Sequence, residues 1–482
     1  MDRSQVIFGN VIDKKTIRKG NKSKAKYIDK FGDETGKVFH LQATNNATLF
    51  DAMNIKDLSL GTKKMKFDDK AIIIGNIRMG FGHYRISIAM ASCAHALGYT
   101  PYWLDYNSFD TTGGKMIRHQ NDLYSFGSRL SQKSKLFNKF FWEPMNSEGF
   151  RKLTYNSIDQ KNAELLAPLC QDLPRDIPYI ATHVWPSQAA VHEGLTHVVN
   201  AIPDNWPMAL HLSEGAIHTV QTPFAFLGYK KLNGMAKNEL KPMPDGVLYE
   251  VGHYIDHEIV STLKEDTKAR LDRLHNSSPL RFLMTVGGAG AQYNIFKEII
   301  LFLIPYIKEN KVVLFINFGD HKNVYEQLNN EIKEYALLST NYFDSWSEFK
   351  ALASSLESIK GIYSIYHKDI FEAVYSTNIL MPKCDLMLTK PSELAYYPIP
   401  KLMIQRVGGH EAYGAIHASE IGDGTFECDS SSEINSMIKL ILSSNEVLEE
   451  MNHRILKLNE EGMYNGAYRC VELAVNKKIT TK

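Results

Sequence analysis

Between residues 70 and 470, short apolar runs alternate with stretches in which apolar residues recur every three or four positions. The run Ile72–Ile74 is entirely apolar, and apolar residues at helical spacing follow over 86–97, ending before Gly98. A second apolar run begins at Pro101. Uninterrupted apolar strands separated by amphipathic helices are typical of a parallel sheet that is covered on both faces. The pattern therefore predicts a strand, helix and strand over 72–104.

The alternation stops in a charged, Gly/Pro-rich span at about 228–278 and then starts again. A strand is predicted at 281–286, with a glycine-rich turn and a helix face over 295–304 after it. Further strands are predicted at 312–318, 361–366 and 385–389, and a further helix at 370–380. We expect an α/β protein with two doubly wound, Rossmann-like domains, at 67–250 and 279–470, that face each other across a cleft. Ligands of such sheets bind at the carboxyl ends of the strands.

The first 66 residues differ from the rest of the chain, because they are polar and rich in lysine and their apolar residues are sparse. We expect residues 1–66 to form an N-terminal extension that packs on the first domain. The 482 residues, 44% of them hydrophobic, are enough for the two cores predicted after it.

The net charge and the cysteine content limit which binding partners and which cellular compartment we expect. The formal net charge is +1, so nucleic acid and anionic lipid are not attracted by the protein as a whole and would need a local patch. We expect no nucleic-acid partner. Five scattered cysteines without a CxxC pair suit a reducing compartment, and no run reaches the roughly 18 apolar residues that span a bilayer. We expect a cytoplasmic protein that at most contacts a membrane surface.

The first predicted strand runs into the turn Gly80-Phe81-Gly82-His83, directly before a helix. Such a turn presents backbone N–H groups and a helix N-terminus to an anionic ligand. Gly80, Gly82 and His83 are therefore candidate site residues. A neutral imidazole titrates near pH 7, so His83 could act as a general base on an acceptor hydroxyl. The alternative is a histidine that only caps the helix.

The second domain offers three clusters of candidates. Gly287, Gly288 and Gly290 follow its first strand and would allow a nucleotide to approach the backbone closely, although a strand-to-helix turn needs glycine in any case. The strand at 385–389 is followed by Lys390, Pro391 and Ser392, which suit the first turn of a helix. A later turn contains Gly409, His410 and Glu411, which could bind sugar hydroxyls or simply form a solvated loop. No Asp-X-Asp motif or other metal-ligand pattern occurs, so neither a metal nor a cofactor is expected.

The order and spacing of these motifs resemble the GT-B glycosyltransferases. Within them, the chain is similar to the group that holds the enzyme adding N-acetylglucosamine to lipid-linked muramyl peptide and the galactolipid and glucolipid synthases. The matching positions are Gly82-His83, Asp385, Glu393, Pro400 seven residues after Glu393, Gly409-His410-Glu411, and Asp204 in Pro203-Asp204-Asn205-Trp206. The resemblance covers about residues 70–470.

The resemblance implies a metal-independent transfer of a hexose from a nucleotide diphosphate sugar, most simply a UDP-sugar, to a lipid or polyprenyl-linked acceptor. Under it, His83 is catalytic, and Gly80, Gly82 and Asp204 lie on the acceptor side. The donor-binding residues are then Gly287, Gly288, Gly290, Lys390, Ser392, Glu393, Gly409, His410 and Glu411. Glu393 would accept hydrogen bonds from ribose hydroxyls.

Two departures from the family pattern leave alternatives open. The segment between Asp385 and Glu393 is short and lacks the Gly-Gly-X-X-Thr diphosphate loop, and Ala415 stands near the usual position of an asparagine. Donor binding is then altered or lost, and the chain could be a degenerate binding protein. A sugar-nucleotide 2-epimerase on the same fold is a further alternative, but it needs cleft carboxylates, and no convincing pair is evident.

The stretch 129–152 mixes basic residues with Phe137, Phe140, Phe141, Trp142 and Phe150. Basic residues beside aromatic ones are typical of segments that lie at a lipid headgroup layer. An amphipathic helix buried against its own domain has the same composition. A peripheral membrane contact is therefore one of two interpretations of this stretch.

Overall fold

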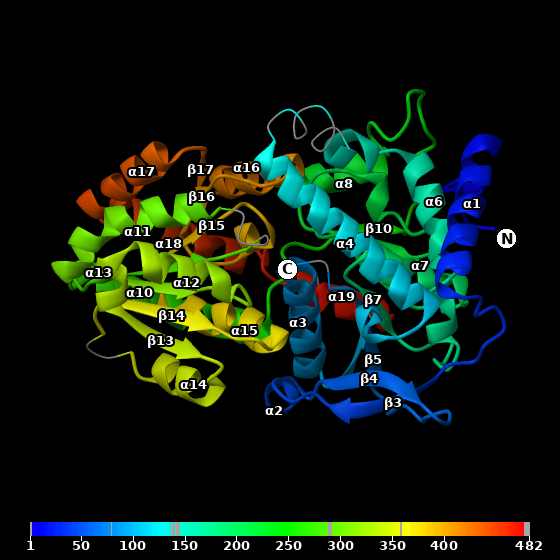
Figure 1. The fold of residues 1–482 in the computed structure, drawn as a ribbon, viewed down its shortest axis with the longest axis horizontal. Helices are drawn as coiled ribbons and strands as arrows, with labels where there is room; N and C mark the ends of the chain where they lie inside the picture. The colour runs from blue at the N-terminus through cyan, green and yellow to red at the C-terminus, as the bar shows by residue number, and fades with distance from the viewer. Residues whose placement is uncertain are drawn as a thin grey trace. The chain divides into compact units, whose positions relative to one another are not determined.

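The computed structural model describes residues 2–78, 80–134, 136, 140, 145–287, 292–356 and 359–476. The chain forms two compact units (Figure 1). Unit 1 comprises residues 1–257 and the chain from 465 onward, and unit 2 comprises residues 258–464. The C-terminal helix α19 (Gly466–Ala474) thus returns to unit 1, where it packs against α3 (Phe81–Ala96) and β8 (Val198–Ala201).

In the described part of unit 1, eight strands form one sheet in the order β10-β9-β8-β7-β5-β6-β4-β3. All neighbours are parallel except the β3–β4 pair. The remaining strands of this sheet are β3 (His40–Asn45), β4 (Lys56–Gly61), β5 (Ala71–Asn76), β6 (Thr100–Asp105), β7 (Tyr179–Ala181), β9 (Ile217–Val220) and β10 (Leu248–Glu250). A separate antiparallel pair consists of β1 (Val6–Ile7) and β2 (Asn10–Val11).

Helices cover both faces of this sheet. α3 and α19 pack on one face, and α7 (Val184–His192) packs on the other, where it contacts β5, β7 and β8. The other α-helices in the described part of unit 1 are α1 (Lys14–Phe31), α2 (Phe50–Met53), α4 (Thr112–Lys133), α6 (Leu153–Ala163) and α8 (Pro223–Lys230). β5 is buried along its whole length, which explains its uninterrupted apolar sequence.

The predicted unit at 72–104 is present as β5, α3 and β6. Gly80 is the N-cap of α3 with φ +82°, a conformation that favours glycine, and Gly98 follows the helix with φ +83°. α3 is buried along most of its length, so its apolar pattern is broader than that of a surface helix.

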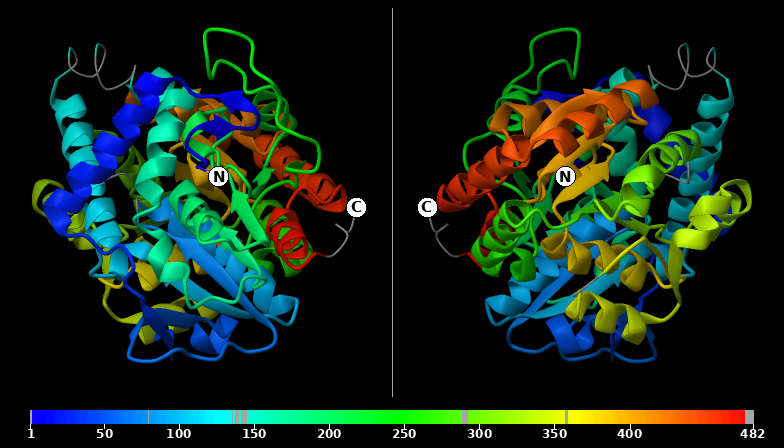
Figure 2. Two further views of the ribbon diagram at one scale, coloured as in Figure 1. Left: turned by 90° about the vertical axis from the view of Figure 1, so that its right-hand side faces the viewer. Right: turned by 90° about the vertical axis from the view of Figure 1, so that its left-hand side faces the viewer.

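The residues predicted as an N-terminal extension, 1–66, belong to unit 1. β3 and β4 lie at the edge of the main sheet, and Leu41 and Leu58 from them are buried in its core. α1, dark blue in Figure 2, packs along α6. The apolar residues are sparse because the segment covers an existing core and does not form one of its own.

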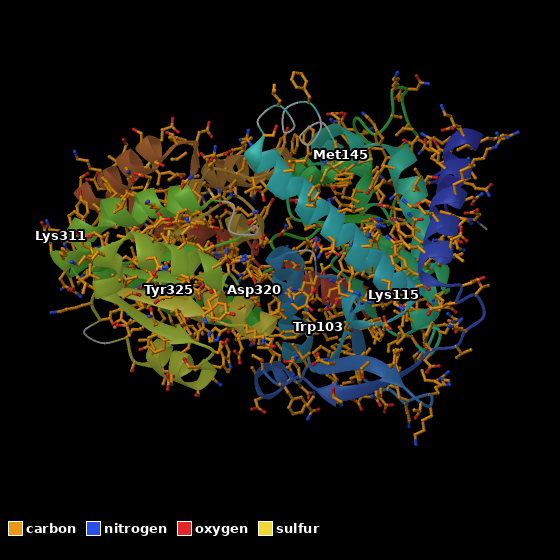
Figure 3. All side chains as sticks on the ribbon, viewed as in Figure 1. Trp103, Lys115, Met145, Lys311, Asp320 and Tyr325 are labelled. Atoms are coloured by element: carbon orange, nitrogen blue, oxygen red, sulfur yellow. The ribbon has the colours of Figure 1, made fainter. Side chains whose placement is uncertain are left out.

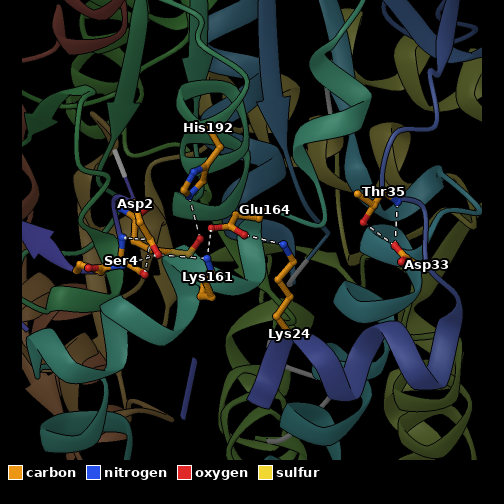
Figure 4. A network of polar contacts seen from close by, with 10 residues as sticks. Asp2, Ser4, Lys24, Asp33, Thr35, Lys161, Glu164 and His192 are labelled. Atoms are coloured by element: carbon orange, nitrogen blue, oxygen red, sulfur yellow. Dashed lines mark hydrogen bonds and ion pairs between the residues drawn. The ribbon is translucent and has the colours of Figure 1, made fainter. Parts of the chain in front are cut away.

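Ion pairs hold this segment to α6 (Figure 4). Lys24 of α1 pairs with Glu164 at 2.6 Å, and Lys161 bridges Glu164 at 2.8 Å and Asp2 at 3.3 Å. The Ser4 hydroxyl donates a hydrogen bond to the Asp2 carboxylate. Lys24, one of the lysines of the first 66 residues, therefore helps to hold this segment against α6.

In the described part of unit 2, seven parallel strands follow the order β13-β14-β12-β11-β15-β16-β17. They are β11 (Leu280–Thr285), β12 (Val312–Asn317), β13 (Ser339–Phe343), β14 (Ile362–Tyr366), β15 (Leu386–Thr389), β16 (Lys401–Ile404) and β17 (Gly424–Cys428). The helices are α9 (His257–Ser261), α10 (Leu263–His275), α11 (Tyr293–Lys308), α12 (Lys322–Glu331), α13 (Lys333–Leu338), α14 (Trp346–Ser354), α15 (Ile370–Leu380), α16 (Ala412–Ile421), α17 (Ser431–Ser443) and α18 (Glu446–Glu460). The prediction of two doubly wound α/β domains is confirmed.

A buried ion pair fixes the amino ends of β16 and β17. Lys401 Nζ lies 2.7 Å from Asp423 Oδ2, and both side chains are fully buried. Lys401 Nζ also donates to the carbonyls of Tyr397 and Ile399, at 2.8 and 3.2 Å. Burial lowers the pKa of Lys401 and raises the pKa of Asp423, so each charge depends on the other. Removing one partner leaves an uncompensated buried charge.

We expect Asp423→Ala to destabilise the protein by about 3–5 kcal/mol, measured as a lower urea midpoint of unfolding. The double variant Lys401→Met with Asp423→Leu should regain most of the loss, because neither charge then remains buried. As a matched control, Asp245→Ala removes the exposed partner of Lys230 and should leave the midpoint unchanged. An unchanged midpoint for Asp423→Ala would show that the pair is not needed.

Candidate functional site

In unit 1 the strand order changes direction at β5, which has β6 on one side and β7 on the other. Ligands of doubly wound sheets bind outside the carboxyl ends of the strands at such a point. His83 lies in the first turn of α3, directly after β5, and Thr182 and His183 directly follow β7. The topology therefore gathers these three residues at the expected position.

A backbone carbonyl determines which nitrogen of the His83 ring carries the proton. His83 Nδ1 lies 2.7 Å from the Thr182 carbonyl oxygen. A carbonyl can only accept a hydrogen bond, so Nδ1 carries the proton, and in the neutral ring Nε2 carries the lone pair. The Thr182 and Ser87 hydroxyls also contact each other at 2.7 Å. His83 is partly exposed and so combines a fixed tautomer with a proton-accepting nitrogen.

Two further histidines lie beside His83. The ring of His183 packs edge-to-face on that of His83, with centroids 4.9 Å apart. His211 Nε2 lies 2.9 Å from Asp204 Oδ2, and only 5% of the His211 side chain is exposed. Burial, with further contributions from His83 and His211, holds the pKa of His183 well below its usual value. Asp204, predicted on the acceptor side, thus belongs to the same group of polar side chains as His83.

Of the predicted residues of unit 1, Gly80 and Gly82 form the turn that starts α3. Sequence reasoning missed Thr182, His183 and His211. His183 has the same position as His83, between a strand end and a helix start, and that signal could have identified it. His211 follows Asp204 by seven residues in an irregular segment, and no spacing rule points to it.

In unit 2 the corresponding point lies between β11 and β15. The last residues of these strands, Thr285 and Thr389, join through their hydroxyls at 3.1 Å. Gly287 lies beside Lys390, because a Cβ added to Gly287 would stand 3.6 Å from Lys390 Cε. Two predicted residues, Gly288 and Gly290, lie outside the described residues.

Glu411 organises the loop that follows β16. Its Oε1 forms an ion pair with Lys390 Nζ. Its Oε2 accepts hydrogen bonds from the backbone N–H groups of Val407 at 2.8 Å and Gly408 at 3.2 Å. Glu411 is thus placed to position Lys390 and the loop, while the prediction assigned it to sugar hydroxyls. Gly409 and His410 lie in the short 3₁₀ turn Gly409–Glu411, and the His410 side chain is outside the described set.

The segment after Lys390 differs in detail from the predicted helix start. A single 3₁₀ turn covers Glu393–Tyr396, with Ser392 as its N-cap. Glu393 opens this turn and is partly exposed near the carboxyl end of β15. Asp385 lies at the other end of β15, where Arg273 pairs with it at 2.7 Å and the Arg281 N–H donates to it. Asp385 therefore supports the sheet away from the carboxyl ends.

The basic and aromatic stretch is only partly described. Phe137, Phe141 and Trp142 lie outside the described residues. Arg151 stacks over the Trp206 ring at 4.3 Å and donates to the Asn233 carbonyl, and Lys152 donates to that of Gly234. These two basic residues therefore stabilise unit 1 itself.

Glu411→Ala should raise the hydrogen-exchange rates of the Val407 and Gly408 amides by about tenfold, because both lose their acceptor. Exchange followed by mass spectrometry over residues 405–412 measures this. Glu420→Ala, at an exposed position of α16, is the matched control and should leave the rates unchanged. Wild-type rates in Glu411→Ala would show that the loop does not depend on its carboxylate.

Two family profiles match the chain. Residues 6–231 match the family described as "Domain of unknown function (DUF6937)", and residues 243–475 match "Domain of unknown function (DUF6938)". No curated protein matches the sequence. The profiles meet between residues 231 and 243, close to the boundary at residue 257 between the structural units.

Among solved structures, the chain is similar to UDP-GlcNAc 2-epimerase from Neisseria meningitidis bound to UDP-GlcNAc (12% identity, TM-score 0.45, covering 84% of this chain and 100% of that one). It is also similar to S. aureus MnaA in a co-structure with UDP (14%, 0.47, 85% and 99%). A third is alpha,alpha-trehalose 6-phosphate synthase from Burkholderia multivorans (11%, 0.42, 85% and 98%). At these identities none of the three assigns a role to a residue of this chain.

Proposed function

We propose that the protein is a metal-independent glycosyltransferase that moves a hexose from a UDP-sugar to a hydroxyl of a lipid or glycan acceptor. Unit 1 binds the acceptor, with His83 as general base, and unit 2 binds the nucleotide. The observation that carries the proposal is the Thr182 carbonyl at 2.7 Å from His83 Nδ1, since it leaves Nε2 as the proton acceptor at a ligand-binding edge of the sheet.

The proposed step is a single displacement in which His83 takes up the proton that is released. The acceptor oxygen forms a bond to the anomeric carbon of the donor sugar, and the bond from that carbon to the diphosphate oxygen breaks. His83 Nε2 takes the proton of the attacking hydroxyl, and the diphosphate leaves with the bonding electron pair. The Thr182 carbonyl helps, because it accepts a stronger hydrogen bond once the ring is positively charged.

The leaving diphosphate needs positive charge and N–H donors. Lys390, beside Gly287, supplies the charge, and Ser392 and Glu393 follow it at the same edge of the unit 2 sheet. A diphosphate near Lys390 would compete with Glu411 for its ammonium group. Glu393 would hold the ribose, and Gly409 and His410 would lie near the sugar.

The epimerase alternative needs carboxylates that are placed to move protons. Asp105, partly exposed at the carboxyl end of β6, has a pKa raised by desolvation, but it accepts hydrogen bonds from Tyr84 and from the Asn107 N–H. The alternative of a degenerate binding protein is based on the short segment before Glu393. A measurement of nucleotide binding distinguishes this alternative from both enzymes, because each enzyme must bind a nucleotide sugar.

An exposed apolar patch supports a lipid acceptor or a peripheral membrane contact. No helix among the described residues is long and apolar enough to cross a bilayer. The second half of α4 and the segment after it nevertheless expose several large apolar side chains, among them Phe126 at 61% and Leu136 at 71%. The patch consists of Leu123, Tyr124, Phe126, Leu130, Leu136, Phe140 and Met145, the last of which is labelled in Figure 3.

The donor site is tested by calorimetric titration with UDP. Glu393→Ala should weaken UDP binding by about 1.5–3 kcal/mol, roughly tenfold to a hundredfold, through lost hydrogen bonds to a carboxylate. His83→Ala is the matched variant: turnover, followed as UDP release from UDP-sugars, should fall about 100-fold while UDP affinity stays the same. If the wild type binds no UDP at millimolar concentration, the degenerate binding protein replaces this proposal.

The membrane contact is tested by sedimentation with phosphatidylglycerol-containing vesicles. Phe126→Ser should weaken vesicle binding by about thirtyfold, since burying a Phe side chain contributes roughly 2 kcal/mol. Leu337→Ser, at a position of unit 2 that is 77% exposed, is the control and should bind like the wild type. If the wild type, Phe126→Ser and Leu337→Ser sediment equally with the vesicles, the proposed membrane contact is wrong.

A further inference from the structure

His183 has a fixed proton position that complements that of His83. It is the N-cap of α7, and its Nδ1 accepts the backbone N–H of Trp185 at 3.2 Å. A nitrogen that accepts a hydrogen bond holds no proton, so the ring is neutral and its proton is on Nε2. His83 has the opposite tautomer, with the proton on Nδ1 and the lone pair on Nε2.

The surroundings of His183 favour this neutral form. The titratable groups near it are His83 from α3, together with His211 and Asp204 from the segment after β8. Trp185 of its own helix packs on the ring with centroids 5.0 Å apart. Burial lowers the pKa of His183 most, His83 and His211 add to this, and Asp204 opposes it. Protonation would also break the cap at Trp185.

The proton on Nε2 of His183 has no acceptor among the residues that the structure describes, although His183 is only 5% exposed. A ring N–H that has no acceptor in the protein donates to water or to a ligand. The edge-to-face contact keeps this ring next to that of His83 at the carboxyl ends of β5 and β7. Two neighbouring rings thus provide a donor, from His183, and an acceptor, from His83.

We infer that His183 donates its Nε2 proton in a hydrogen bond to the oxygen of the same hydroxyl group that His83 deprotonates. This inference rests on the proposed function. A hydroxyl is the group that accepts one hydrogen bond and donates another, so the pair selects alcohols and water over carboxylate or fully ionised phosphate nucleophiles. As His83 takes the proton, the oxygen becomes more negative, and the His183 hydrogen bond strengthens without any transfer of its own proton.

Two substitutions separate this role from helix capping. In His183→Asn the side-chain oxygen can replace Nδ1 as acceptor for the Trp185 N–H, while the donor at the Nε2 position is lost. In His183→Gln an amide donor can reach the Nε2 position, while the cap is weakened. We expect His183→Asn to keep the wild-type melting temperature and UDP affinity but to lower kcat/KM for UDP release from UDP-sugars, with water as acceptor, by about tenfold to a hundredfold. His183→Gln should recover part of this loss.

Ring ¹⁵N spectra of histidine-labelled protein supply a readout that does not need turnover. The signal that disappears in His183→Asn should be that of a neutral ring protonated at Nε2, unchanged between pH 5.5 and 8. A titrating ring, or one protonated at Nδ1, would overturn the inference whatever the activity. Wild-type kcat/KM in His183→Asn would overturn it as well. A wild type that neither binds UDP nor releases it from UDP-sugars would instead refute the proposed function, and the role of His183 with it.

Discussion

The burial of both faces of each parallel sheet is the constraint on which the rest of the structure depends. β5 and β12 are buried at every position, and each ends in an asparagine, Asn76 or Asn317. A polar side chain in the middle of such a strand would lose water without gaining a partner. Polar groups that can meet a ligand are therefore confined to the strand ends and to the turns that follow, where both candidate sites lie.

In unit 1 the position at which β7 ends determines the hydrogen bonds of the candidate site. The Thr182 N–H still pairs with the Gly75 carbonyl, as if β7 continued, whereas the Thr182 carbonyl accepts from His83. One residue later, the chain starts α7, and His183 caps that helix. Two rings with opposite tautomers thus follow from where one strand stops and two helices begin.

In unit 2 an ion pair organises the carboxyl ends of the strands. Lys390 is held by Glu411, whose second oxygen binds two backbone N–H groups of the loop after β16. The pair keeps the Lys390 cation at the end of β15 and links it to this loop. Ligand binding at Lys390 would therefore act directly on the position of residues 407–411.

The sequence by itself determined the two α/β units, because the periods of buried strands and covering helices depend on local burial alone. It also placed Gly80, His83 and Lys390 at strand ends, since turn glycines and polar residues after apolar runs mark those ends. Only the tertiary structure decided which strands neighbour each other, and hence that His83 meets Thr182 and His183 from a segment 99 residues away. Likewise, only the fold shows that β3 and β4 complete the first sheet, that Asp385 pairs with Arg273 at the opposite end of β15, and that Glu411 is committed to Lys390. Such pairings depend on contacts between distant segments, which no local period or spacing encodes.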